Sequence, residues 1–125
     1  AVERDDVMAW VEAYESALRD DEVDAVDELF ADDAVYRPSP YEDAIVGLAA
    51  IKEFWPEDDG TTFTMAAAPV AVDGSTAVVR VLVRYERPRR QEYTDLWLLH
   101  FDADGRVDSF EEWAYWPGRP YSAED

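Results

Sequence analysis

Hydrophobic and polar residues alternate with a two-residue period over the last third of the chain. The alternation predicts three consecutive strands, over Thr76–Glu86, Glu92–Phe101 and Arg106–Trp116. Short turns at 87–90 and 102–105, the second containing Asp-Gly, make neighbouring strands antiparallel. Neither face of this predicted sheet is plainly polar, so we expect something to cover both faces.

Three segments before residue 60 instead repeat their apolar residues at steps of three and four, which is typical of amphipathic helices. They span Asp6–Arg19, Val23 to near Asp32-Asp33, and Leu48–Trp55, and Pro56 ends the last one. Tyr14 lies in the middle of the first apolar stripe. We therefore expect it to point inward, with a hydroxyl that needs a hydrogen-bond partner.

Two further strands complete the pattern. Ala34–Arg37 is stopped by Pro38-Ser39-Pro40, and Thr62–Val72 leads through Asp73-Gly74 into the main sheet. Ala66-Ala67-Ala68-Pro69 within the second strand predicts a bulge or an edge position. The order of elements predicts an α+β fold ending in a four-stranded antiparallel meander, and 125 residues make one domain, 1–125.

Charge and composition exclude several classes of function. Thirty acidic residues face eleven basic ones, giving a net charge of −19, so neither nucleic acid nor an anionic membrane is an expected partner. The chain has no Cys and one His, His100, so we expect no metal and no cofactor. No apolar run reaches the ~20 residues of a membrane span. The first ten residues lack the pattern of a signal peptide, and we expect a cytoplasmic location.

The abundance of Asp and the presence of a single Lys, Lys52, favour adaptation to a high-salt cytoplasm over simple solubility, a halophilic interpretation. If carboxylate repulsion destabilises the folded state, screening it should stabilise the protein. We predict that raising KCl from low to molar concentration increases the melting temperature, measured by circular dichroism. A melting temperature that stays flat or falls would contradict this interpretation.

Three stretches carry a family resemblance, namely Ala31–Val35, the helix Gly47-x3-Ile51-x2-Phe54-Trp55, and Phe101-Asp102-x2-Gly105-Arg106-Val107. They resemble the NTF2-like superfamily, in its SnoaL-like and ketosteroid-isomerase-like branch. The resemblance covers roughly Val7 to Trp116. It implies a cystatin-like cone, in which three N-terminal helices pack on a curved antiparallel sheet and enclose a pocket. It also implies a homodimer formed through the outer face of that sheet.

The residues of this chain can be compared with the catalytic residues of each branch of the superfamily. Tyr14 matches the tyrosine that donates a hydrogen bond to the substrate oxyanion in ketosteroid isomerases. The general-base aspartate of that family would fall at Pro38, and its protonated aspartate at Trp97, so that mechanism lacks both carboxyl groups. The dehydratase branch uses histidines, whereas His100 is predicted on the face opposite Asp95 and Trp97.

The epoxide-hydrolase branch resembles an Arg-x-Asp pair on one strand with an Asp on the last strand. Arg84-Tyr85-Glu86 keeps an Arg-x-carboxylate spacing, and Glu112 is expected at the position of the last acid. Glu in place of Asp moves each carboxylate by about one methylene, and an error of ~1 Å can cost about a hundredfold in rate. The chain contains no Asn, so the asparagine that holds the water in that branch is absent.

These comparisons yield a set of candidate site residues. The catalytic candidates are Tyr14, Glu112, Asp95 and Arg84. The expected ligand-binding wall comprises Arg80, Glu86, Trp97, Phe54, Trp55, Phe63 and Tyr36. A structural alternative stands beside each role. Tyr14 can be a core tyrosine with a satisfied hydroxyl, and Arg80 and Asp95, expected on neighbouring strands, can form a buried ion pair that braces the wall.

Two hypotheses of function remain. The first is cofactor-free acid–base catalysis, of isomerase, cyclase or hydrolase type, on a small, largely apolar, oxygen-bearing molecule bound in the pocket. The second is a non-catalytic small-molecule-binding or accessory dimerisation domain. Pairing decides between them, because a carboxylate that is matched to Arg80 or Arg84 is not free to act as a base.

Overall fold

The computed structural model describes residues 2–20, 22–55, 62–87 and 89–118. The helices are α1 (Arg4–Arg19), the 3₁₀ turn η1 (Val23–Ala25), α2 (Val26–Leu29) and α3 (Leu48–Phe54). The strands are β1 (Phe30–Arg37), β2 (Ile45–Val46), β3 (Thr62–Asp73), β4 (Thr76–Arg87), β5 (Gln91–Phe101) and β6 (Val107–Tyr115). No helix among these residues is long and apolar enough to cross a membrane.

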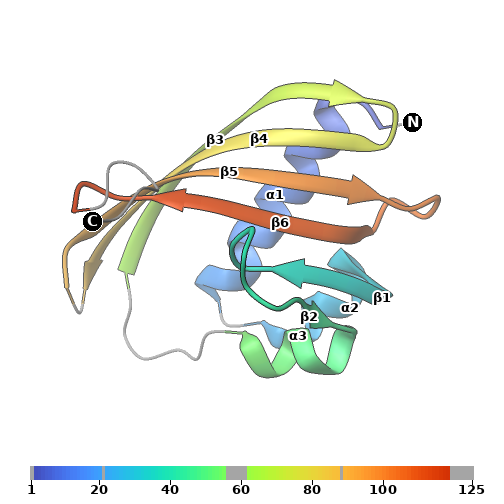
Figure 1. Cartoon of the computed structure of the whole chain (residues 1–125), viewed down its shortest axis with the longest axis horizontal. Helices are drawn as coiled ribbons and strands as arrows, with labels where there is room; N and C mark the ends of the chain where they lie inside the picture. Colours follow the sequence, from blue (N-terminus) through green and yellow to red (C-terminus); the bar gives the residue numbers. More distant parts are fainter. Residues whose placement is uncertain (1, 21, 56–61, 88, 119–125) are drawn as a thin grey trace.

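All six strands form one curved sheet in the order β2-β1-β6-β5-β4-β3 (Figure 1). The predicted meander of β3 to β6 is confirmed, but the sheet is mixed rather than wholly antiparallel, because β1 runs parallel to β6. β3 is an edge strand with a register shift between Pro69 and Ala71, as Pro69 led us to expect.

The second predicted helix is shorter than expected, and the strand after it is longer. The segment predicted as a helix from Val23 to near Asp32-Asp33 is a 3₁₀ turn followed by four α-helical residues. Phe30 already belongs to β1, where it pairs with Val107 of β6. Tertiary pairing thus overrides the local helical period, as expected for a short element with only a few apolar residues.

The hydrophobic core lies between α1 and the sheet, and Figure 1 shows α1 crossing behind the strands. Val7, Trp10 and Val11 form the buried stripe of α1, as the helical period predicted. The indole N–H of Trp10 donates to the carbonyl oxygen of Leu29 over 2.8 Å, which ties α1 to α2. The Trp10 ring also meets Phe30 of β1 edge-on, at 5.6 Å between centroids. This packing fixes α1 against the inner face of the sheet.

The opposite, outer face of the sheet carries exposed apolar side chains. Leu96 of β5 and Trp113 of β6 are directly paired, and each is 39% exposed. Glu111, next along the same face, accepts a hydrogen bond from the Trp113 indole over 2.7 Å and pairs with Arg37. The expectation that both faces are covered is therefore met for the inner face and not at these positions of the outer face.

Candidate functional site

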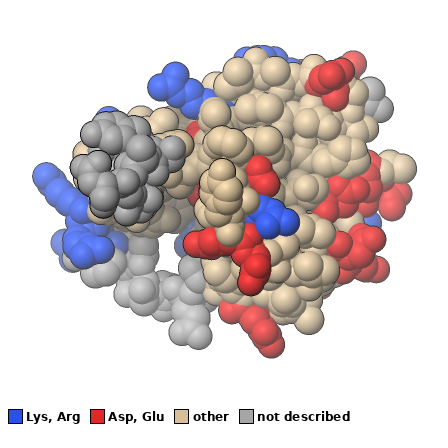
Figure 2. Space-filling view, in the orientation of Figure 1, with Lys and Arg blue, Asp and Glu red and all other residues tan. Residues whose placement is uncertain are grey.

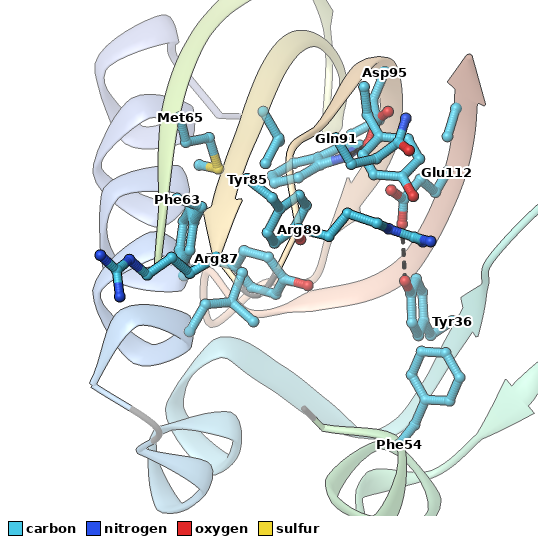
Figure 3. A pocket seen from close by; sticks show the side chains of 16 residues that line it. Tyr36, Phe54, Phe63, Met65, Tyr85, Arg87, Arg89, Gln91, Asp95 and Glu112 are labelled. Carbon is cyan, nitrogen blue, oxygen red and sulfur yellow. Dashed lines mark hydrogen bonds between the residues drawn. The ribbon is translucent and has the colours of Figure 1, made fainter. Parts of the chain in front are cut away.

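A cavity of about 500 Å³ opens between the inner face of the sheet, α1 and the end of α3. Seven of its 16 lining residues are aromatic, which suits an apolar ligand. The aromatic lining residues are Tyr14, Tyr36, Phe54, Phe63, Tyr85, Tyr93 and Trp97. Asp95 and Glu112 are its only carboxyl groups among the described residues (Figure 3).

Strand register brings the two carboxyl groups to the same inner face. Trp97 of β5 is opposite Val79 of β4 on one side and Glu112 of β6 on the other. Asp95, two residues before Trp97, therefore points to the same face and lies diagonal to Glu112. Asp95 is only 3% exposed, whereas the side chain of Glu112 retains some exposure at the cavity.

Three predicted site residues lie outside the cavity. Arg84 is opposite Glu92 and forms an ion pair with it over 3.2 Å, and Arg80 is opposite Leu96. Both guanidinium groups and Glu86 are on the exposed outer face, so the expected Arg80–Asp95 ion pair and the pocket position of Arg84 are wrong. Alternation is the reason, because Arg84 follows Val83 and precedes Tyr85, which both line the cavity.

The remaining candidates lie in or behind the cavity wall. Tyr36, Phe54, Phe63 and Trp97 line the cavity. Trp55 does not line the cavity, contrary to expectation, because it is buried behind that wall, with its ring 5.5 Å from the Tyr14 ring. Its indole nitrogen has no hydrogen-bond partner among the described residues.

Hydrogen bonds orient each carboxyl group. The indole N–H of Trp97 donates to Oδ2 of Asp95 over 3.3 Å, and the hydroxyl of Tyr36 donates to Oε1 of Glu112 over 2.8 Å. Oδ1 of Asp95 is buried without a donor in the described part of the chain. Among the described residues, no ion pair involves either carboxyl group. Neither Arg80 nor Arg84 is therefore paired with Asp95 or Glu112.

Burial raises the pKa of Glu112 from its usual value of 4.5 to about 8. A side-chain hydrogen bond to Asp95 and the like charge of that carboxylate act in the same direction, while the hydrogen bonds from Tyr36 and Trp97 oppose them. A pKa of about 8 keeps Glu112 mainly protonated at neutral pH.

Tyr14 adds a hydrogen-bond donor beside the pair. Its ring stacks on Trp10, at 5.2 Å between centroids, and meets Trp97 edge-on at 5.3 Å. Burial, followed by the charges of Glu112, Tyr85 and Asp95, raises the pKa of Tyr14, so the group stays a phenol. In the described part of the chain its hydroxyl has no hydrogen-bond partner, and Tyr14 lines the cavity. A ligand oxygen can therefore accept from it.

Several lining residues were not among the sequence candidates. Tyr85 and Tyr93 share the inner face with Val83 and Asp95, so the two-residue period alone would have found them. Met65 lies two residues after Phe63 on β3, so the same period would have found it, whereas Arg89 lies in the β4–β5 turn, where no alternation applies. His100, by contrast, lies on the outer face, as predicted, and contacts Asp108 over 2.6 Å.

Within the part of the chain that the structure describes, no group of three or more His, Asp or Glu side chains is arranged to hold a metal ion. The cavity itself holds two carboxyl groups, Asp95 and Glu112, and such a pair suits the transfer of a proton to and from a ligand.

Comparisons with known proteins identify a family and several solved structures that share this architecture. A family model described as the SnoaL-like domain matches residues 10–110. An LEH-like epoxide hydrolase from M. tuberculosis is 21% identical with a TM-score of 0.73, covering 91% of this chain and 86% of that chain. No curated protein sequence matches this chain.

Two further solved structures share the fold. The S. rosetta CaMKII hub is 19% identical with a TM-score of 0.68, covering 92% of this chain and 98% of that chain. SalBIII, an epoxide hydrolase/cyclase-like enzyme in pyran ring formation in the polyether salinomycin, is 20% identical with a TM-score of 0.66. That match covers 87% of this chain and 91% of that chain. At these identities the similarity shows a common fold.

Proposed function

The chain belongs to the SnoaL-like domain family, and we propose that its cavity performs cofactor-free acid–base catalysis on a small, largely apolar molecule that carries an oxygen function. The observation that carries this proposal is the Asp95–Glu112 pair, which faces a cavity rich in aromatic side chains and has no ion-pair partner among the described residues, and burial there raises the pKa of Glu112 to about 8. The reaction class that we favour is the opening or closing of a strained cyclic ether, by water or by a hydroxyl of the substrate.

In such a reaction the Asp95–Glu112 pair both supplies one proton and receives one. Glu112 donates its proton to the ether oxygen as the carbon–oxygen bond breaks, and the nucleophilic hydroxyl forms a new bond to that carbon. The nucleophile's proton then passes to the pair, which at that moment would otherwise hold two negative charges. A dianion buried among aromatic rings is costly, so this return of a proton is strongly favoured.

Tyr14 and Tyr36 serve different parts of this step. The free hydroxyl of Tyr14 is a fixed donor for the oxygen on which negative charge develops, the geometry that stabilises an oxyanion. Tyr36 instead donates to Oε1 of Glu112, which fixes the orientation of that carboxyl group and leaves the other oxygen to carry the proton. Tyr36 is therefore a positioning residue rather than a catalytic one.

Two neighbours in fold support a hydrolase or cyclase over an isomerase. Their names describe an LEH-like epoxide hydrolase and an epoxide hydrolase/cyclase-like enzyme. The present chain differs from the expected Arg-x-carboxylate pattern, because Arg84 and Glu86 lie on the outer face. The proposal therefore relies on Asp95 and Glu112 alone for proton transfer, with no arginine between them.

A non-catalytic binding or dimerisation domain is the alternative. It is favoured by the burial of Asp95, which is only 3% exposed and so offers a ligand little access to its carboxylate. The similarity to a CaMKII hub shows that the fold is not confined to proteins named as enzymes. Replacing the proton donor distinguishes the two hypotheses.

We predict that the wild-type protein opens styrene oxide or cyclohexene oxide in H₂¹⁸O, with one ¹⁸O in the diol by mass spectrometry. Glu112→Gln keeps the shape and a hydrogen-bond donor but has no proton to transfer. It should lower kcat by roughly 10²–10⁴-fold and change ligand affinity by less than about tenfold. The wild-type kcat should fall as the pH rises through about 8, because the proton donor then ionises.

Glu111→Gln is the matched control, since Glu111 is the next residue along β6 and contacts Arg37 and Trp113 on the outer face. It should retain the wild-type kcat. Equal rates in the wild type and Glu112→Gln would exclude Glu112 as the proton donor. Binding of these epoxides without turnover in the wild type would favour the non-catalytic alternative.

We also propose that the outer face of the sheet forms a homodimer. Leu96 and Trp113 lie side by side there and are each 39% exposed, an apolar contact surface in a chain whose net charge is −19. In a two-fold dimer each side chain would be buried on both subunits, so one substitution places two charges in the interface.

Leu96→Glu should therefore yield monomers at micromolar concentration, whereas the wild type sediments as a dimer in analytical ultracentrifugation. Ala103→Glu, in the exposed β5–β6 turn, introduces the same charge away from this face and should remain dimeric. A wild-type protein that sediments as a monomer at this concentration would refute the dimer.

A further inference from the structure

The mouth of the cavity carries a local excess of positive charge. Four of the eleven basic residues of the chain lie within 84–90, namely Arg84, Arg87, Arg89 and Arg90. In Figure 2 blue side chains gather at the end of the molecule where β4 meets β5, while most of the red ones lie elsewhere. This excess stands out in a protein with a net charge of −19 and creates a local field that attracts anions.

The arginines of this hairpin differ in their surroundings. Arg84 is paired with Glu92 on the outer face. Arg87 and Arg89 line the cavity. Figure 3 shows the Arg87 side chain directed away from the cavity, whereas the Arg89 side chain projects over it in this view, and Arg89 is exposed, as expected at the cavity mouth. Among the described residues, the Arg89 guanidinium group neither forms an ion pair nor donates a hydrogen bond.

The Arg89 guanidinium group is unpaired among the described residues although carboxylates are abundant in the chain. Thirty acidic residues are available, yet none in the described part pairs with Arg89. A guanidinium offers parallel N–H donors whose spacing matches a carboxylate, so one arginine can hold one carboxylate through two hydrogen bonds. A carboxylate supplied by a ligand would accept the hydrogen bonds that the Arg89 guanidinium group can donate.

We propose that Arg89 binds a carboxylate of the ligand at the cavity mouth. The ligand is then a small amphiphile, with an apolar body against the aromatic wall and a carboxylate at the mouth. This inference deepens the proposed function, which places the ligand's reactive oxygen at Glu112 and Tyr14. A carboxylate fits better than a phosphate, because the net charge of −19 repels a dianion twice as strongly as a monoanion.

Matched probes test this inference without requiring turnover. We would titrate 4-phenylbutyrate, 4-phenylbutan-1-ol and 4-phenylbutyl phosphate into the protein at low ionic strength by isothermal titration calorimetry. We expect wild-type protein to bind the carboxylate about tenfold more tightly than the alcohol. Arg89→Gln should abolish this preference and leave the affinity for the alcohol unchanged. Arg89→Lys, which keeps the charge but lacks the fork, should retain only part of it.

Arg84→Gln is the matched control, because it removes the same charge from the same hairpin on the outer face and should keep the tenfold preference. Equal affinity for acid and alcohol in the wild type would overturn the inference. So would binding of neither probe, a preference that persists in Arg89→Gln, or tighter binding of the phosphate. The proposed function fails separately, through unchanged turnover in Glu112→Gln, and that outcome leaves the carboxylate preference standing.

Discussion

Two carboxyl groups on neighbouring strands face the same cavity, and their burial there disfavours the state in which both are ionised. Ionising both Asp95 and Glu112 inside this wall would bury two like charges that have no ion-pair partner among the described residues. A protonated Glu112 avoids this repulsion, and its pKa is accordingly raised to about 8. The hydrogen bonds from Trp97 and Tyr36 then fix which oxygens remain as acceptors.

The fold supplies this arrangement through long-range pairing. Antiparallel pairing of β5 and β6 sets Trp97 opposite Glu112, and the parallel pairing of β1 with β6 brings Tyr36 beside them. Packing of α1 across the inner face, anchored by Trp10, holds the Tyr14 hydroxyl at the same cavity. The functional groups therefore come from four separate elements that meet only in the folded chain, which makes the site sensitive to register rather than to any local motif.

Sequence patterns were sufficient for the fold class, for the meander and for the inward direction of Tyr14, Asp95 and Glu112. The predicted pocket position of Arg84 was wrong, because it relied on the Arg-x-carboxylate spacing, whereas the two-residue period sets Arg84 on the outer face. The parallel partner of β1 and the Tyr36–Glu112 hydrogen bond were beyond reach, since 76 residues separate the two side chains. The shifted pKa of Glu112 depends on burial and on its neighbour Asp95, and neither is visible before the register is known.

The central claim is that Glu112 holds the proton of the pair at neutral pH. The most direct measurement is a carboxyl ¹³C NMR titration of protein labelled at glutamate, with the Glu112 signal assigned by its loss in Glu112→Gln. The account predicts a titration near pH 8, and a lower value in Asp95→Asn, which replaces a like charge with an amide donor. A Glu112 signal that titrates near its usual pKa of 4.5 would contradict the account.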